Sequence, residues 1–354
     1  MQKHLDENTT INLGSFYTPS FVVEMVYKLL EKHIKNLNSY TFLDSSCGYG
    51  DFFTKDFKYI GADIDKIALE KVKINHIFHT NALLNINREK FKIKKNEKLI
   101  IIGNPPYNDK TSIINAKIKK ELFSCDEKLK YRDLGISFLR SYECLEPDFI
   151  CVLHPLSYLI KEANFKALKD FKQKYKLVDG LIISSSIFTP KSSTHFPIII
   201  SFYKKDKKGM DFEYIKNFTF KSVENYSFCL KDFDFINNYV RKYPNLNDKR
   251  KAIAYFHTLR DINALKRNKT FMKNINSNTI KVFKENLTYY IYIHFFKEFC
   301  YKLPYCFGNL DIFIDKDKFL KIEQELLNWF YKKEFDKQKI ENYFKMLFST
   351  YLKE

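Results

Sequence analysis

Short apolar segments alternate with amphipathic segments up to about residue 205, and this alternation restricts the possible fold more than any other feature. The apolar segments have the length of buried strands, and the segments between them have the apolar spacing of helices. Strands are predicted at residues 41–44, 59–64, 99–103, 149–153, 177–184 and 196–203. Strands separated by helices form βαβ units, so we predict an α/β fold with a mostly parallel sheet and helices on both faces.

Three helices are predicted between these strands, at residues 21–33, 136–145 and 163–175. Thr18 is placed to cap the first of them. Pro19 would then be the first helical residue, a position where its missing N–H group costs nothing.

The chain changes character at the lysine-rich turn 204–209, where we place a domain boundary. Residues 1–205 form the predicted α/β domain. Residues 206–354 are rich in lysine and aromatic side chains and are mainly helical in pattern, above all at 249–269 and 316–348.

Positive charge is densest in the second predicted domain. The chain carries 60 basic and 42 acidic residues, a net charge of +18, and residues 241–284 hold 12 basic residues against only Asp248 and Asp261. Such a surface among aromatic residues indicates a polyanionic partner, and we predict nucleic acid. The predicted contact residues are Arg241, Lys249, Arg250, Lys251, Arg260, Lys266, Arg267 and Lys269.

The cysteine pattern indicates a reducing compartment, and the hydropathy predicts no membrane-spanning segment. The seven cysteines include no C-x-x-C pair, so we expect neither a zinc site nor a disulfide framework. The first residues lack the apolar core of a secretory signal, and no apolar run has the length of a membrane span. We therefore expect a cytoplasmic protein without a metal.

Asn104-Pro105-Pro106-Tyr107 follows the predicted strand 99–103, at the edge of the sheet where α/β proteins bind ligands. An amino nitrogen conjugated to an aromatic ring is a poor nucleophile. It needs acceptors that form hydrogen bonds with its two N–H groups and orient its lone pair. The Asn104 side-chain carbonyl and a proline carbonyl supply acceptors, proline has no N–H group, and Tyr107 offers a flat surface for a base.

A second loop follows the strand 41–44 and has the composition of a cofactor loop. Asp44 ends the strand, and Ser45, Cys47, Gly48 and Gly50 follow, with glycines that allow close backbone approach to a ligand. Asp63 ends the next strand, where a carboxylate can accept both hydroxyls of a ribose.

Together these motifs resemble the DNA adenine-N6 methyltransferases of the gamma order, the Taq-type enzymes, over about residues 14–203. The resemblance implies a Rossmann-like class I methyltransferase domain followed by a mainly helical DNA-recognition domain. It also implies S-adenosylmethionine as cofactor. Tyr17, Thr18 and Pro19 would flank its methionine part, Asp44 to Gly50 would form its loop, and Asp63 and Ile64 would hold its adenosine.

Two parts of the resemblance are less complete. The family has an aspartate followed by phenylalanine at the adenine end of the cofactor, where this chain has Asn81 and Ala82. Asn81 still offers a carbonyl acceptor. An aromatic residue of a late motif stacks on the extruded base, and both Phe188 and Phe196 are candidates here.

The resemblance implies direct methyl transfer to N6 of an adenine that has been flipped out of double-stranded DNA, with Asn104 to Tyr107 holding the base. A cognate restriction endonuclease encoded nearby and a monomeric state are further expectations. Arg260 and Arg267, seven residues apart, would share one face of the helix 249–269, and we predict that at least one arginine reads a guanine.

Two other functions are compatible with the motifs. N-P-P-Y can also hold an adenine of ribosomal RNA or a protein glutamine. The length of chain after the sheet and the position of Thr18-Pro19 favour DNA. A non-catalytic DNA-binding subunit with a decayed methyltransferase fold is the third reading, and the intact Asn104–Tyr107 motif argues against it.

Overall fold

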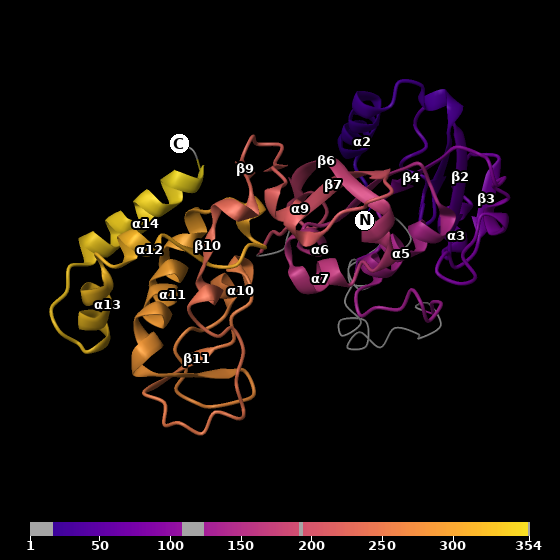
Figure 1. The fold of residues 1–354 in the computed structure, drawn as a ribbon. Helices are drawn as coiled ribbons and strands as arrows, with labels where there is room; N and C mark the ends of the chain where they lie inside the picture. Colours follow the sequence, from indigo (N-terminus) through magenta and orange to yellow (C-terminus); the bar gives the residue numbers. More distant parts are fainter. Residues whose placement is uncertain (1–16, 108–123, 191–193, 353–354) are drawn as a thin grey trace. The chain divides into compact units, whose positions relative to one another are not determined.

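The computed structural model describes residues 17–107, 124–190 and 194–352 (Figure 1). The chain forms two compact units. The first comprises Met1–Ser192 and Ile198–Ile215, and the second Ser193–Pro197 and Lys216–Glu354.

The first unit is built around one seven-stranded sheet of order β3-β2-β1-β4-β5-β7-β6. Its elements are α2 (Ser20–His33), β1 (Thr41–Asp44), β2 (Lys58–Asp63), α3 (Lys66–Leu69), β3 (His76–His79), β4 (Leu99–Gly103), α5 (Leu134–Leu145), β5 (Phe149–Pro155), α6 (Ser157–Ile160), α7 (Glu162–Lys166), α8 (Asp170–Lys174), β6 (Tyr175–Ser184), β7 (Pro197–Lys205) and α9 (Phe212–Asn217). The five strands β3, β2, β1, β4 and β5 pair in parallel in that order, and β7 pairs antiparallel with β5.

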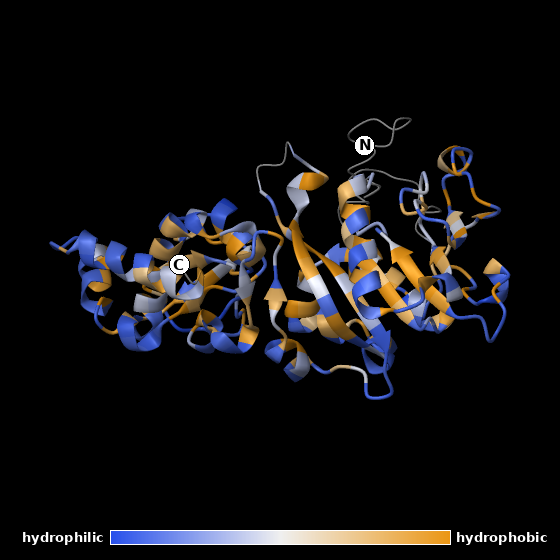
Figure 2. Ribbon diagram, turned by 90° about the horizontal axis from the view of Figure 1, so that it is seen from above, coloured by the Kyte–Doolittle hydropathy of each residue, from blue (hydrophilic) through white to orange (hydrophobic). Residues whose placement is uncertain are grey.

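The centre of this sheet is covered on both faces, as the apolar strand segments predict. Every residue of β1 and β4 is buried, which requires packing on both sides of the sheet. Helix α2 covers one face: the Tyr27 ring lies 6.3 Å from that of Phe42 on β1, and the His33 ring stacks on Phe202 of β7 at 4.8 Å. Figure 2 shows the apolar residues concentrated along the strands.

The strand order reverses between β1 and β4. From β1 the chain proceeds outward to β2 and β3, and then returns to β4 on the other side of β1. A crevice forms at the carboxyl ends of two strands that diverge in this way, and ligands bind there. The two loops singled out in the sequence, after Asp44 and after Gly103, both leave the sheet at this crevice.

Three local predictions for the first unit are wrong. Helix α2 begins at Ser20 with Pro19 as its N-cap, and the Thr18 hydroxyl, which was expected to cap it, accepts the Asn104 amide N–H instead. The helix predicted at 163–175 is two short helices, α7 and α8, separated by Lys169 in a left-handed conformation. Strand β3 was missed because His76 and His79 flank only two apolar residues.

The boundary between the units lies ten residues beyond the predicted one. Helix α9 follows the lysine-rich turn but packs on the first unit: Ile215 is fully buried, and the Phe212 ring lies 5.5 Å from that of Phe165. The Tyr214 hydroxyl donates to the Leu177 carbonyl on β6 at 2.7 Å.

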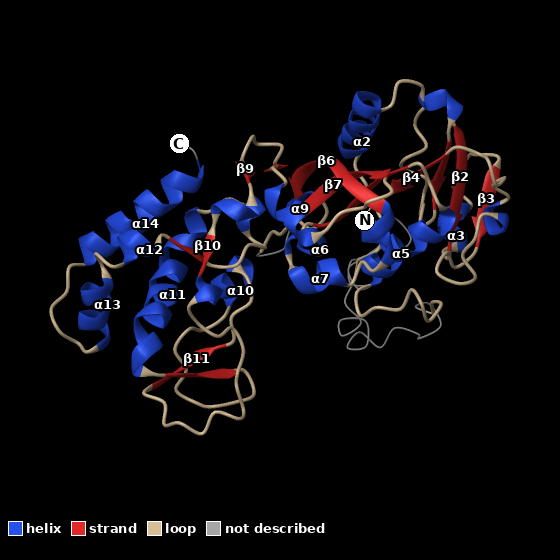
Figure 3. Ribbon diagram, in the orientation of Figure 1, coloured by secondary structure: helices blue, strands red, loops and turns tan. Residues whose placement is uncertain are grey.

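The second unit is mainly helical, with three two-stranded sheets (Figure 3). Its elements are β8 (Phe220–Lys221), β9 (Ser227–Phe228), β10 (Asp234–Phe235), β11 (Ala254–His257), α10 (Ile262–Arg267), β12 (Thr279–Val282), α11 (Leu287–Phe299), β13 (Phe313–Ile314), α12 (Lys316–Phe319), α13 (Glu323–Phe330) and α14 (Lys337–Leu352). Its core is aromatic: the rings of Tyr292, Phe296, Phe344 and Phe348 contact one another across α11 and α14. No helix within the described ranges is long and apolar enough to cross a membrane.

The helical pattern predicted at 249–269 is wrong for much of its length. Residues 249–269 form strand β11 and the short helix α10, which Asp261 caps by accepting the Ala264 N–H. Arg260 precedes the helix and Arg267 ends it, so the two do not share a helical face. Residues 316–348 are mostly helical, as predicted, and form α12, α13 and most of α14.

Candidate active site

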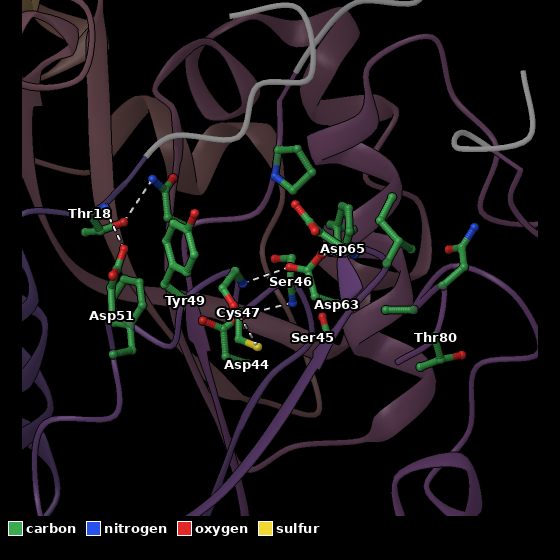
Figure 4. Close-up of a pocket in the computed structure, with 18 of the residues that line it drawn as sticks. Thr18, Asp44, Ser45, Ser46, Cys47, Tyr49, Asp51, Asp63, Asp65 and Thr80 are labelled. Carbon is green, nitrogen blue, oxygen red and sulfur yellow. Dashed lines mark hydrogen bonds between the residues drawn. The ribbon is translucent and has the colours of Figure 1, made fainter. Parts of the chain in front are cut away.

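A cavity of about 430 Å³ lies at the carboxyl ends of β1, β2 and β4, at the crevice described above (Figure 4). It brings together most of the residues predicted to bind a cofactor. Those that line it are Tyr17, Thr18, Asp44, Ser45, Cys47, Gly48, Asp63, Ile64, Asn81, Asn104 and Pro106. Pro19, Gly50, Pro105 and Tyr107 are not among the lining residues.

Asp44 forms the floor of this cavity, between β1 and β4. Its carboxylate accepts the Ser46 backbone N–H at 3.0 Å, and burial raises its pKa well above the usual range. A Cβ atom on Gly103 would lie 2.7 Å from Asp44 Oδ1, and Gly103 has a φ of +139°. Only glycine therefore lets Asp44 take this position between the strands.

Asp63 fixes the loop that follows β1. Its Oδ2 accepts the Gly48 N–H at 2.8 Å, and its Oδ1 accepts the Asp65 N–H at 2.9 Å. Burial raises its pKa. A carboxylate has about four acceptor positions, so two remain for a ligand. Gly50 supports the loop from outside the cavity, with a left-handed φ of +77° and Phe53 against it.

The cavity is acidic although the protein is strongly basic. Four aspartates line it (Asp44, Asp51, Asp63 and Asp65), and among the residues that the structure describes Lys66 is the one basic residue of the lining. One wall is apolar and open to solvent, since Ile64 and Ile67 are 40% and 53% exposed. An acidic cavity with an apolar wall fits a cation that carries a flat ring. It does not fit a polyphosphate.

Asn104 carries the clearest sign of a missing partner. Its Nδ2 donates to Thr18 Oγ1 at 3.3 Å, and the Thr18 backbone N–H donates to Asp51 Oδ2 at 2.8 Å. Within the described ranges, the buried Asn104 Oδ1 and the buried Ser46 Oγ have no hydrogen-bond partner. Both residues line the cavity. Buried polar atoms are almost always paired, so an unpaired acceptor here points to a ligand.

Asp51 was not singled out in the sequence. Its contact with Thr18 joins residues 33 positions apart, and no motif spacing shows such a contact. Burial raises the pKa of Asp51 to about 6, although the N–H bond from Thr18 opposes this shift.

Tyr107 packs below the cavity and does not line it. Its side chain is buried, and burial raises the pKa of its hydroxyl. The nearby Asn104 side chain lowers this pKa slightly, but neither side chain meets the geometry of a hydrogen bond to the other. A Cβ on Gly135 of α5 would lie 2.9 Å from Tyr107 Cβ and 2.5 Å from the Tyr158 hydroxyl, so glycine permits this packing.

Neither candidate for the second stacking surface lines the cavity. Phe188 is half-buried directly after a 3-10 turn, and its N–H donates to the Ser185 carbonyl. Phe196 is half-buried and belongs to the short segment of the second unit. The Asn263 amide holds this segment by donating to the His195 carbonyl at 3.0 Å.

Asn81 lies at the cavity with part of its hydrogen-bonding capacity already used. Its Oδ1 accepts the Leu83 N–H at 2.8 Å, and its Nδ2 donates to the Ser124 carbonyl at 2.8 Å. One acceptor position on Oδ1 remains for a ligand.

The arginines of the second unit that were predicted to contact nucleic acid differ in whether their side chains already have partners within the described part of the protein. Arg250 is held by Asp248 and Glu285 and lies 3.7 Å above the Phe283 ring, so its planar group is already used. Arg241, Arg260 and Arg267 are exposed, and no described side chain pairs with them.

The four predicted lysines also differ. Lys266 is half-buried, and burial lowers its pKa, which makes it a poor phosphate ligand. Lys249, Lys251 and Lys269 are exposed. In the described part of the chain, no cluster of His, Cys, Asp and Glu side chains is arranged to hold a metal ion.

Comparison with solved structures gives distant matches. The M protein of the type I restriction enzyme EcoKI aligns with 92% of this chain and 74% of its own, at 12% identity and a TM-score of 0.44. A type I restriction-modification methyltransferase subunit from Streptococcus thermophilus aligns with 62% of this chain and 48% of its own, at 14% identity and a TM-score of 0.41. A modification subunit ascribed to a type I restriction enzyme from Vibrio vulnificus aligns with 59% of this chain and 47% of its own, at 14% identity and a TM-score of 0.43.

This chain therefore spans about half the length of the last two proteins. No protein-family model matches the sequence, and a search of curated proteins found no match. Because these sequence identities and TM-scores are low, the fold follows from the strand order of the chain itself. The mostly parallel sheet, in which β7 pairs antiparallel with β5 and both faces are covered, gives the first unit the Rossmann-like α/β fold that the sequence predicts.

Proposed function

We propose that this protein is an S-adenosylmethionine-dependent DNA methyltransferase that methylates N6 of adenine in double-stranded DNA. The observation that carries the proposal is the buried, unpaired Asn104 Oδ1 at the cavity. An unpaired carbonyl there can accept a hydrogen bond from an exocyclic amino group. The neighbouring Pro105 and Pro106 have no N–H group and leave only acceptors in this loop.

The cavity suits the proposed cofactor. S-adenosylmethionine carries a positive sulfur and an ammonium group, and bound there it would supply an activated methyl group. Asp63 has acceptor positions left for the ribose hydroxyls, and the exposed Ile64 and Ile67 offer an apolar contact to its adenine. Ser46 Oγ and the acidic lining provide further polar contacts to a cation.

Thr18 and Asp51 orient the reactive asparagine. Because the Thr18 hydroxyl accepts the Asn104 amide N–H, the amide group is held with its carbonyl oxygen away from Thr18. Asp51 holds Thr18 in turn by accepting its backbone N–H. The acceptor is thus fixed before the base arrives, and positioning of this kind is the main contribution to such a transfer.

The DNA substrate is supported by the charge of the chain. The net charge of +18 and the exposed Arg241, Arg260 and Arg267 fit binding to phosphates and base edges. We extend the proposal to a role as the modification enzyme of a restriction-modification system, with double-stranded DNA and a nearby endonuclease as partners. A gene for an endonuclease beside this one would support that role.

A parallel assay tests the proposed substrate class. Transfer of labelled methyl groups from S-adenosylmethionine is measured on unmethylated plasmid DNA, ribosomal RNA and a release factor. We expect label in DNA with the wild type, none with Asn104→Ala, and wild-type label with the exposed control Asn36→Ala. Label in RNA or in the release factor would support those substrates instead. DNA binding without transfer to any of the three would support the non-catalytic reading.

A further inference from the structure

An open groove in the second unit is lined mainly by aromatic rings. It has a volume of about 580 Å³ and lies between β11, the segment that follows α10, and the end of α13. The rings come from Tyr255, Phe271, Trp329 and Phe330, and all four are partly exposed. The exposed Ile253 adds an aliphatic edge.

The rings are held in place by contacts behind the groove. His294 of α11 stacks on Trp329 with ring centres 4.7 Å apart, and Phe271 lies 5.7 Å from Phe330. The Met272 N–H donates to the Tyr255 carbonyl at 2.8 Å and joins two sides of the groove. These contacts fix the positions of the lining rings.

Lysines are frequent in and beside the chain segments that line the groove. Five exposed lysines lie in the groove lining or within two residues of it, and Glu334 is the one acidic residue equally close in the sequence. No described side chain pairs with these lysines. They are Lys251, Lys269, Lys273, Lys332 and Lys333.

We propose that this groove binds an unstacked nucleobase of the bound DNA, with the lysines holding the phosphates on either side. Aromatic rings accept any base by stacking, and lysines follow the backbone, which is how proteins hold unstacked nucleic acid. A protein segment that covers an apolar groove needs no such excess of cations, so charge favours DNA. This inference rests on the proposed function, because it assumes that the protein binds DNA. It concerns a surface that is not part of the catalytic cavity.

The chain carries its own probe for this test, because Trp329 is its single tryptophan. A base that stacks on or beside the indole changes its fluorescence. The titration uses a short duplex with one bulged thymine and the same duplex fully paired, without S-adenosylmethionine. We expect the bulged duplex to quench Trp329 fluorescence more strongly and at lower concentration.

Two variants show whether the groove causes the effect. Ile253→Asp places a negative charge on the groove, and Leu320→Asp places the same charge on an exposed apolar residue outside it. We expect Ile253→Asp to weaken binding of the bulged duplex about tenfold or more, and Leu320→Asp to leave it near wild type. Circular dichroism checks that both fold.

Equal quenching by the two duplexes, or equal affinity of the two variants, would overturn the proposal. Stronger quenching by polyglutamate than by either duplex would identify an acidic protein partner instead. The assay needs no methyl transfer. If the protein binds the bulged duplex at the groove but modifies no DNA, only the proposed function is overturned. If Ile253→Asp methylates DNA and binds the bulged duplex with wild-type affinity, only the groove proposal is overturned.

Discussion

Replacing Thr18 with valine tests the proposed orientation of Asn104 without changing the volume of the side chain. Thr18 is 2% exposed, and its backbone N–H, which Asp51 accepts, is kept in Thr18→Val. The change removes one neutral hydrogen bond of 3.3 Å and leaves the Asn104 Nδ2 unpaired. Such a loss costs about 1–1.5 kcal/mol, which corresponds to roughly a five- to tenfold slower methyl transfer.

The assay is single-turnover methyl transfer at saturating cofactor, which separates the chemical step from binding. Thr18→Ser keeps the hydroxyl and is the matched control, expected within about twofold of wild type because its hydrogen bond is retained. If Thr18→Val and Thr18→Ser react equally fast, the hydroxyl does not orient Asn104 and the proposed arrangement is refuted.

Three further predictions concern the cavity. Asp63→Ala should weaken binding of S-adenosylmethionine at least about tenfold by calorimetry, since a hydrogen bond to a charged acceptor is worth about 1.5–3 kcal/mol, whereas the exposed Asp56→Ala should not. Because burial raises the pKa of Asp51 to about 6, its negative charge is lost as the pH falls through that value, so cofactor affinity should fall there in the wild type and fall less in Asp51→Asn. Gly103→Ala should lower the free energy of unfolding in urea by roughly 1–3 kcal/mol, because it strains a left-handed residue against Asp44, and an unchanged midpoint would contradict that packing.

The sheet was predictable because its signal is local. A run such as Leu99–Gly103 is apolar throughout, and a strand buried on both faces needs nothing else to be identified. The ends of such strands also locate the cavity, so Asp44, Asp63 and Asn104 could be selected from their positions alone. The edge strand β3 lacks this signal, since exposed histidines stand on either side of its two half-buried apolar residues.

Contacts between distant residues could not be predicted. Asp51 matters through Thr18, and Tyr107 is buried because Gly135 of α5 gives it space, and neither relation has a fixed spacing in the sequence. Arg250 is the residue type expected to contact DNA, but its guanidinium group is already paired with Glu285, which lies 35 residues away in the sequence.

The helix predicted at 249–269 in the second unit was too long for a related reason. Residues 249–269 carry apolar residues at helical spacing, but β11 pairs with β12, a strand more than 20 residues away. Pairing with a distant strand overrides a local helical pattern.

The most direct test of the proposed reaction is the identity of the modified base. DNA incubated with the protein and S-adenosylmethionine is digested to nucleosides and analysed by mass spectrometry, with Asn104→Ala treated in the same way. The proposed function predicts N6-methyladenine with the wild-type protein and none with the variant. Methylated cytosine, or equal N6-methyladenine from both proteins, would contradict the assignment of Asn104 as the group that holds the adenine amino nitrogen.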